Sequence, residues 1–190
     1  HLGQTGGIMR MTTRELLRTL GGECIEQVRA DIALENRIES ISRGYIDKPV
    51  EDWPELEFRW DFSVESQRFA FDGMSPNDAK ALETYDLICG LVRLDQFDGK
   101  LCARSSKSKQ EFWSVGDKSK LAYLIVYLSE NRPVTPPYIV PLENGEIFIE
   151  GGNHRYAVAK QLDLSQLPIY VSREHKEAIE QLLDIEWTDG

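Results

Sequence analysis

The stretch EIFIEGGNHRYAVAKQL, residues 146–162, joins a β-like run to a helical pattern through two glycines. The β-like run ends at Glu150, and an apolar pattern with helical spacing begins directly after Arg155. Just ahead of the stretch lies Asn144-Gly145, a dipeptide that tolerates the positive φ of a tight type I′ turn. The sequence therefore predicts a β-hairpin, then a glycine turn, then a helix.

The last 80 residues extend this pattern to a compact α+β module, which we expect to be built around a small mixed sheet. The expected elements are a strand at 111–115, a helix at 117–131, hairpin strands at 136–142 and 146–150, a helix from about Asn153 to Leu162, a strand at 167–171 and a final helix starting near Ser172.

A mainly helical region, residues 12–110, is expected before this module, which itself spans residues 111–190. Thr12 and Glu15 form a candidate capping box, and Gly21-Gly22 predicts a break between two helices. The apolar residues at helical spacing in this part are Leu17, Leu20, Cys24, Val28 and Ile32.

Residues 44–63 predict a loop with a short strand at 56–60, and residues 75–94 predict a long helix that opens with Ser75 and Pro76. Its expected buried face consists of Leu82, Tyr85, Cys89 and Val92. Residues 1–11 are expected to be a disordered lead or an expression remnant, with the natural start at Met9 or Met11.

The chain has 190 residues and a formal net charge of −10, from 22 Lys and Arg against 32 Asp and Glu. The longest apolar run, residues 121–128, is too short to cross a bilayer, so we expect no membrane partner. The acidity disfavours nucleic acid as a partner, because like charges repel. The one basic stretch, residues 100–109, predicts a solvated, mobile loop, with phosphate contact as the alternative.

The cysteines, Cys24, Cys89 and Cys102, are scattered, odd in number and form no CxxC pair. This pattern predicts reduced thiols in a cytoplasmic protein, and neither a disulfide framework nor a metal site. Each cysteine lies in an apolar or loop context without a histidine nearby in the sequence, so we expect none of them to be catalytic.

The glycine turn has the chemistry of an anion site. The first amides of a helix lack partners within the helix, and the helix dipole places partial positive charge there. Gly151 and Gly152 would leave room for a phosphate to approach the backbone. Arg155 offers a planar fork of donors, His154 a donor that gains charge as pH falls, and Asn153 an amide.

An alternative interpretation needs no ligand. In this interpretation Gly151-Gly152-Asn153 forms only a turn, and His154 and Arg155 pair with the carboxylates of Glu150 or Asp163. Residue types alone do not separate the two interpretations.

The segment PPYIVPLENGEIFIEGGNHRYAVAKQLDLSQLPIYV, residues 136–171, resembles the ParB/sulfiredoxin superfamily. Sulfiredoxins carry GGCHRYAA where this chain has GGNHRYAV, and ParB proteins carry a GERR-like turn before a similar helix. The likeness covers about residues 111–171. It implies a nucleotide site for ATP or CTP with Mg²⁺, whose phosphates lie at the turn. An ungapped alignment adds Lys120 as a phosphate ligand, with Tyr123 and Tyr127 in place of two hydroxyl residues.

The departures from this superfamily restrict the activity. Sulfiredoxins need a cysteine thiolate where this chain has Asn153, and an amide cannot attack or carry sulfur, so we do not expect a sulfiredoxin. ParB proteins continue into a basic helix-turn-helix module, which the 19 residues after the last expected strand do not contain. A member of the superfamily that phosphorylates free serine uses a glutamate base from the region ahead of the helix. In this chain that region contains Glu111 and Asp117. These two are the candidate catalytic residues, with surface carboxylates or helix caps as the alternative.

Two classes of function remain open at this point. The first is a nucleotide-dependent enzyme, an NTPase or a small-molecule phosphotransferase. The second is a non-catalytic regulatory protein that keeps the fold and binds a protein partner through residues 12–110.

Overall fold

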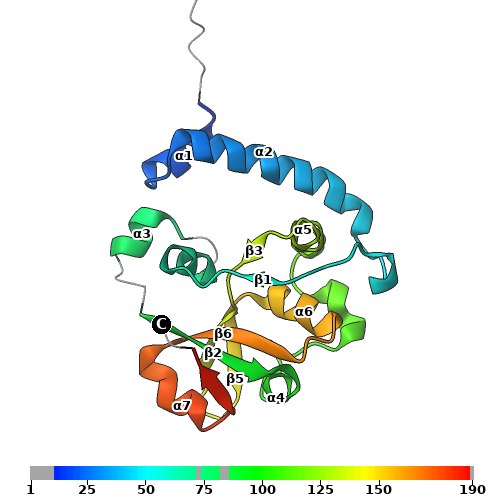
Figure 1. The fold of residues 1–190 in the computed structure, drawn as a ribbon, viewed down its shortest axis with the longest axis vertical. Helices are drawn as coiled ribbons and strands as arrows, with labels where there is room; N and C mark the ends of the chain where they lie inside the picture. Colours follow the sequence, from blue (N-terminus) through cyan, green and yellow to red (C-terminus); the bar gives the residue numbers. More distant parts are fainter. Residues whose placement is uncertain (1–10, 72–73, 82–85, 189–190) are drawn as a thin grey trace, which may run out of the picture.

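The computed structural model describes residues 11–71, 74–81 and 86–188, and it shows an α+β fold (Figure 1). A five-stranded mixed sheet has the strand order β5-β4-β6-β2-β7. Its strands are β2 (Leu87–Arg93), β4 (Tyr138–Pro141), β5 (Ile147–Gly151), β6 (Gln166–Ser172) and β7 (Ile185–Trp187). Only the β4–β6 pair is parallel within this sheet. The small strands β1 (Arg59–Trp60) and β3 (Pro133–Val134) form a separate parallel pair.

The helices pack in two groups. Figure 1 shows α2 crossing the top of the molecule above α5, while α6 lies between α5 and the sheet. The α-helices are α1 (Thr13–Leu20), α2 (Ile25–Ser42), α3 (Pro76–Ala81), α4 (Leu94–Asp98), α5 (Lys118–Ser129), α6 (Asn153–Gln161) and α7 (Lys176–Glu180). The 3₁₀ helices are η1 (Arg43–Tyr45), η2 (Val50–Asp52), η3 (Val64–Phe71), η4 (Lys109–Ser114) and η5 (Arg173–His175).

Helix α6 is buried on two sides and joins two apolar clusters. Tyr156 and Ala159 pack into the cluster that includes the sheet, α4 and α7. Ala157 and Val158 pack into the cluster formed by α5 and η4. Because α6 is fixed on both sides, the position of its first turn is determined by the core.

The predicted hairpin is confirmed, with a different turn. β4 and β5 pair antiparallel, with Ile139 opposite Ile149. The Leu142 amide donates to Glu146 O at 2.8 Å, and the Gly145 amide donates to Leu142 O at 3.0 Å. Within this loop only Gly145 has a positive φ, 79°, so the loop is of the three-residue kind with a left-handed glycine and not the expected type I′ turn.

Two of the expected elements are wrong. Where a helix was expected over 75–94, α3 ends at Ala81 and residues 87–93 form strand β2, while Leu82 and Tyr85 lie outside the described residues. β2 lies between β6 and β7, so sheet pairing overrides its helical spacing. Residues 111–114 belong to η4 and Val115 is its C-cap, so no strand forms at 111–115; Ser108 and Glu111 make a capping box at the start of η4.

The remaining expected elements are present. They are the break at Gly21-Gly22 between α1 and α2, the short strand β1, helices α5 and α6, strand β6 and the helical segment after Ser172. The basic stretch 100–109 differs from expectation, because its backbone is packed against β5. Ile147 donates to Lys100 O at 2.8 Å, and Cys102 donates to Ile147 O at 2.9 Å.

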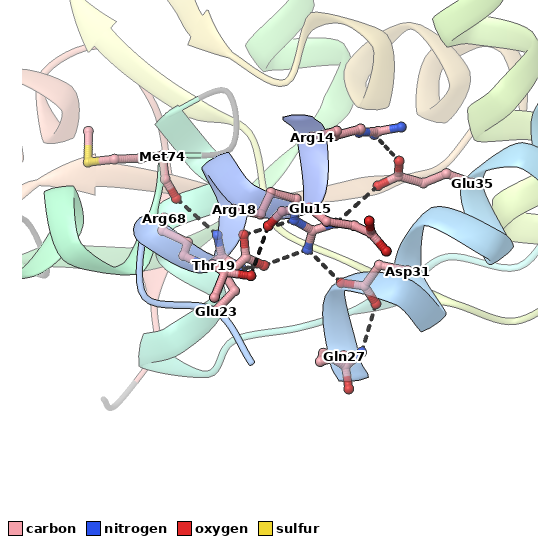
Figure 2. Close-up of polar contacts among 10 residues, drawn as sticks. All are labelled: Arg14, Glu15, Arg18, Thr19, Glu23, Gln27, Asp31, Glu35, Arg68 and Met74. Carbon is pink, nitrogen blue, oxygen red and sulfur yellow. Dashed lines mark hydrogen bonds and ion pairs between the residues drawn. The ribbon is translucent and has the colours of Figure 1, made fainter. Parts of the chain in front are cut away.

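Helix α1 is attached to the protein by charged groups (Figure 2). Arg18 contacts Glu23 (Nε–Oε1 2.9 Å) and Asp31 (Nη2–Oδ2 2.6 Å). Glu15 contacts Arg29 at 2.8 Å. None of the α1 residues, all of which lie in the described part of the chain, is buried. Its leucines point outward, with Leu16, Leu17 and Leu20 exposed by 47%, 63% and 68%.

The glycine pair before α6 has a packing reason. A Cβ on Gly151 would lie 2.0 Å from the carbonyl oxygen of Ala70 in η3. Gly152 has φ 94°, and a Cβ there would lie 2.8 Å from the Cα of Pro137. The space at the Cβ position of Gly151 is therefore occupied by the backbone of η3.

We predict that Gly151→Ala destabilises the protein by about 3 kcal/mol or more, since the clash is with backbone and no side chain can move away. Gly44→Ala is the matched control, because nothing lies within 4 Å of its Cβ position, and it should change stability by less than about 1 kcal/mol. Urea unfolding of both variants measures the difference. Equal midpoints would contradict the close approach.

We also predict that Arg18→Ala lowers stability by about 1–2 kcal/mol at pH 7, because it leaves Glu23, which is only 12% exposed, without its main partner. Arg43→Ala, at an exposed pair with Glu39, should cost less than about 0.5 kcal/mol.

The Arg18 effect should depend on pH. Hydrogen bonding from Arg18 holds the pKa of Glu23 below its usual value of 4.5. The stabilisation is therefore present above this value and lost as pH falls through the lower, folded-state pKa. Unfolding curves at pH 7 and pH 3 should show the difference between wild type and Arg18→Ala shrinking in acid. A difference that persists unchanged at pH 3 would rule out the ion pair as its cause.

Candidate anion-binding site

A hollow of about 430 Å³ lies where β5 ends and α6 begins. It is bordered by three segments, namely the basic stretch before η4, the start of α5, and the β5–α6 turn. The lining residues that carry its polar chemistry are Arg104, Lys107, Lys120, Glu150, Asn153 and His154.

The backbone of the β5–α6 turn presents a helix N-terminus to this hollow. Gly152 is the N-cap residue of α6, in the left-handed conformation. A glycine cap has no side-chain oxygen to offer, so the first-turn amides receive no hydrogen bond from the cap position. The side-chain amide of Asn153 donates from Nδ2 to Ile149 O at 3.2 Å, which fixes the turn to the end of β5.

Three cations border the hollow. They are Arg104, Lys107 and Lys120. Within residues 11–71, 74–81 and 86–188, no carboxylate lies within ion-pair distance of any of them. The Arg104 guanidinium lies 5.3 Å from the centre of the Phe148 ring. In a chain of net charge −10, this local excess of positive charge distinguishes the hollow from most of the surface.

Non-local contacts hold the basic stretch in place. Ile149 donates to Ser105 Oγ at 3.0 Å, and Lys160 Nζ donates to Lys107 O at 2.6 Å. Lys160 also pairs with Asp98 at 2.6 Å. Arg104 and Lys107 are thus site residues that the sequence marked only as part of a basic run.

His154 lines the hollow as a neutral group. Burial lowers its pKa below the usual 6.5, the nearby charge of Lys120 lowers it further, and Asp117 and a hydrogen bond with the Val115 backbone oppose the shift. Nε2 is buried without a hydrogen-bond partner among the described residues. A Cβ on Gly116, which has φ 60°, would lie 2.9 Å from Nε2, so only glycine accommodates the imidazole here.

Arg155 lies on the other side of the turn from His154 and is not among the residues that line this hollow. Its guanidinium donates to the backbone carbonyl of Thr135 and, at 3.4 Å, to that of Pro136. The structure therefore brings Lys120, Gly152, Asn153 and His154 together and separates Arg155 from them.

The candidate bases Glu111 and Asp117 are exposed helix caps. Glu111 accepts from the Ser108 amide at 2.9 Å, and Asp117 accepts from the Ser119 amide at 2.8 Å. The Ser108 amide and hydroxyl lower the pKa of Glu111, and the Ser119 hydroxyl, at 2.7 Å, and amide lower the pKa of Asp117. Neither group lines the hollow, whereas Glu150, which sequence reasoning considered only as an ion-pair partner, does.

A larger hollow of about 490 Å³ beside β2 and β7 is lined by Arg93 and by carboxylates, and Glu180 there already accepts hydrogen bonds from Lys176 and Trp187. In the described parts of the chain no cluster of three or more His, Cys, Asp or Glu could hold a metal ion. No helix of that part has the length and apolarity that a bilayer requires. Cys24, Cys89 and Cys102 are free thiols outside the hollow.

Comparisons with protein-family models, with curated proteins and with solved structures find no match for this chain. The geometry of the hollow is therefore the basis of the proposed function.

A prediction follows for His154. Because the charge of Lys120 contributes to its low pKa, Lys120→Ala should raise that pKa toward the usual value. Lys100→Ala removes an exposed charge of the basic stretch that does not border the hollow, so it should leave the His154 pKa unchanged. An NMR titration of the imidazole protons measures both. The same His154 pKa in wild type and Lys120→Ala would show that the lysine charge does not reach the ring.

Proposed function

We propose that the protein binds the phosphates of a nucleotide of the ATP or CTP type in the hollow at the start of α6. The observation that carries this proposal is the gathering of Arg104, Lys107 and Lys120, without carboxylate partners in the described chain, around a helix N-terminus whose cap has no side chain. Cations and first-turn amides together favour a ligand with several negative oxygens. The likeness of the turn to the ParB/sulfiredoxin superfamily supports the same ligand class.

Binding without chemistry is the form of the function that we favour. The two carboxylates expected to act as bases are engaged as helix caps and carry lowered pKa values, so they are weak proton acceptors. A regulatory protein whose nucleotide site controls its contacts with a partner fits this arrangement.

A phosphotransferase or NTPase is the second candidate, and Glu150 is the reason for keeping it. This carboxylate borders the same hollow as the cations and the neutral His154. A base at that position could accept a proton from a hydroxyl or water next to a bound phosphate, with Mg²⁺ brought by the nucleotide. Nucleotide turnover that disappears in Glu150→Gln while binding persists would establish this alternative.

We predict that Lys120→Ala weakens nucleotide binding about ten- to a hundredfold, the size of a lost charged hydrogen bond. Lys100→Ala should leave affinity within about twofold, because it changes net charge equally but lies outside the hollow. Isothermal titration with ATP, CTP and GTP, with and without Mg²⁺, provides the affinities. Thermal shift provides a second reading, since ligand at 100 times its Kd adds about 2.7 kcal/mol. Wild-type protein that binds none of these nucleotides would refute the proposed function.

A further inference from the structure

A second hollow, of about 330 Å³, lies beside the same two helices. Leu124 of α5 and Arg155 of α6 border it, together with Phe69 of η3 and the rings of Tyr123 and Tyr127. Its volume lies within the range of about 300–1,000 Å³ that is usual for small-molecule sites. Unlike the first hollow, it is lined largely by aromatic and aliphatic side chains.

Two tyrosines of α5 supply most of the aromatic surface of this hollow, and the Arg132 guanidinium lies 5.9 Å from the centre of the Tyr127 ring. Tyr123 and Tyr127 are one helical turn apart, and their rings stack with centroids 5.9 Å apart and planes inclined by 23°. Phe69 is 46% exposed, so part of its ring is available to a ligand. Neither tyrosine hydroxyl has a hydrogen-bond partner among the described residues, and burial raises the pKa of Tyr123 to about 12. Both hydroxyls are therefore protonated at neutral pH.

Polar groups at the rim match the edge of a heteroaromatic ring. The Arg155 guanidinium is a planar cation at the rim, whose Nη1 donates to the carbonyls of Thr135 and Pro136 and whose Nη2 donates to the Phe69 carbonyl at 3.5 Å. The Asp61 carboxylate, which accepts from the Ser63 amide at 2.9 Å, is an acceptor at the same hollow. A donor and an acceptor beside stacked rings suit a flat ligand with hydrogen-bonding atoms on its edge.

The two hollows are neighbours along α5. Lys120 borders the first, and Tyr123, Leu124 and Tyr127 border the second. Residues at positions i, i+3, i+4 and i+7 lie on one face of a helix, so these side chains follow each other along α5. On the α6 side, Gly152 borders the first hollow, and its Cβ position would lie 2.9 Å from Nη2 of Arg155, which borders the second.

We infer that the second hollow takes the purine or pyrimidine base of the nucleotide whose phosphates lie at Lys120, with the base against Tyr123 and Tyr127. This inference rests on the proposed function. It adds that the ring of the ligand, and not only its phosphates, contributes to affinity. Stacking of a base on an aromatic side chain typically contributes enough to change affinity by tenfold or more.

The test compares ligands with and without a base. Affinities for ATP, CTP and inorganic tripolyphosphate are measured by isothermal titration on the full chain. We expect Tyr123→Leu and Tyr127→Leu to weaken nucleotide binding about tenfold and to leave tripolyphosphate affinity unchanged. Tyr123→Phe and Tyr127→Phe keep the rings and should bind nucleotides within about twofold of wild type. Phe62→Leu is the matched control, because this ring is 52% exposed and lies outside the hollow.

The outcomes separate this inference from the proposed function. Wild-type affinity that is equal for nucleotides and tripolyphosphate would overturn the base site and leave the phosphate site standing. Leucine variants that keep their melting temperature and bind nucleotides normally would overturn it as well. If a leucine variant unfolds, the wild-type affinities for nucleotide and for tripolyphosphate still show whether the base contributes to binding. Wild-type protein that binds neither ligand would refute both.

Discussion

The contact on which much of the structure depends is the approach of the Ala70 carbonyl to Gly151. A Cβ at that position would lie 2.0 Å from the oxygen, so the end of β5 and the backbone of η3 can lie together only because residue 151 is a glycine. This contact links a segment from the first half of the chain to the β5–α6 turn. Gly152 then turns the chain into α6 with a left-handed φ, which places His154 and Arg155 on different sides of the turn. Gly151 and Gly152 thus determine where His154 borders the first hollow and where Arg155 borders the second.

Local signals predicted those parts of the fold in which local interactions decide the conformation. The β4–β5 hairpin, α5 with its Asp117 cap, and α6 after the glycine pair all have their determinants within a few residues. Strand β2 was missed because its conformation depends on β6 and β7, which are about 80 and 95 residues away in the sequence. At the candidate site, Asn153 and His154 could be predicted from the glycine turn, whereas Lys120 was expected only from the resemblance to sulfiredoxins. Arg104 and Lys107 could not be assigned to it, because hydrogen bonds to β5 and to Lys160 bring them there. The direction of Arg155 is set by backbone carbonyls that no pattern reveals.

Charge is distributed so that the candidate site differs from the protein around it. The net charge of −10 repels a phosphorylated ligand at long range, and only groups close to the ligand can reverse this effect. Arg104, Lys107 and Lys120 supply those charges at pH 7, whereas His154 stays neutral because burial and Lys120 oppose its protonation. A phosphate close to the ring would favour the protonated form, so occupation of the hollow and the charge state of His154 are coupled. Arg104 and Lys120 are exposed and Lys107 is half-buried, so water screens the repulsion among these three cations.

The polarity of α1 is the reverse of what an amphipathic helix in a globular protein usually shows, because its charged residues face α2 and its leucines face outward. Detachment of α1 would therefore uncover little additional apolar surface on α1 itself. Denaturant sensitivity and heat capacity change both scale with newly exposed area, so such an opening would have a small m-value and a small ΔCp. The amide hydrogens of α1 would then exchange with solvent through a local fluctuation, at nearly the same rate with or without moderate urea. The amide hydrogens of the sheet would exchange only through global unfolding.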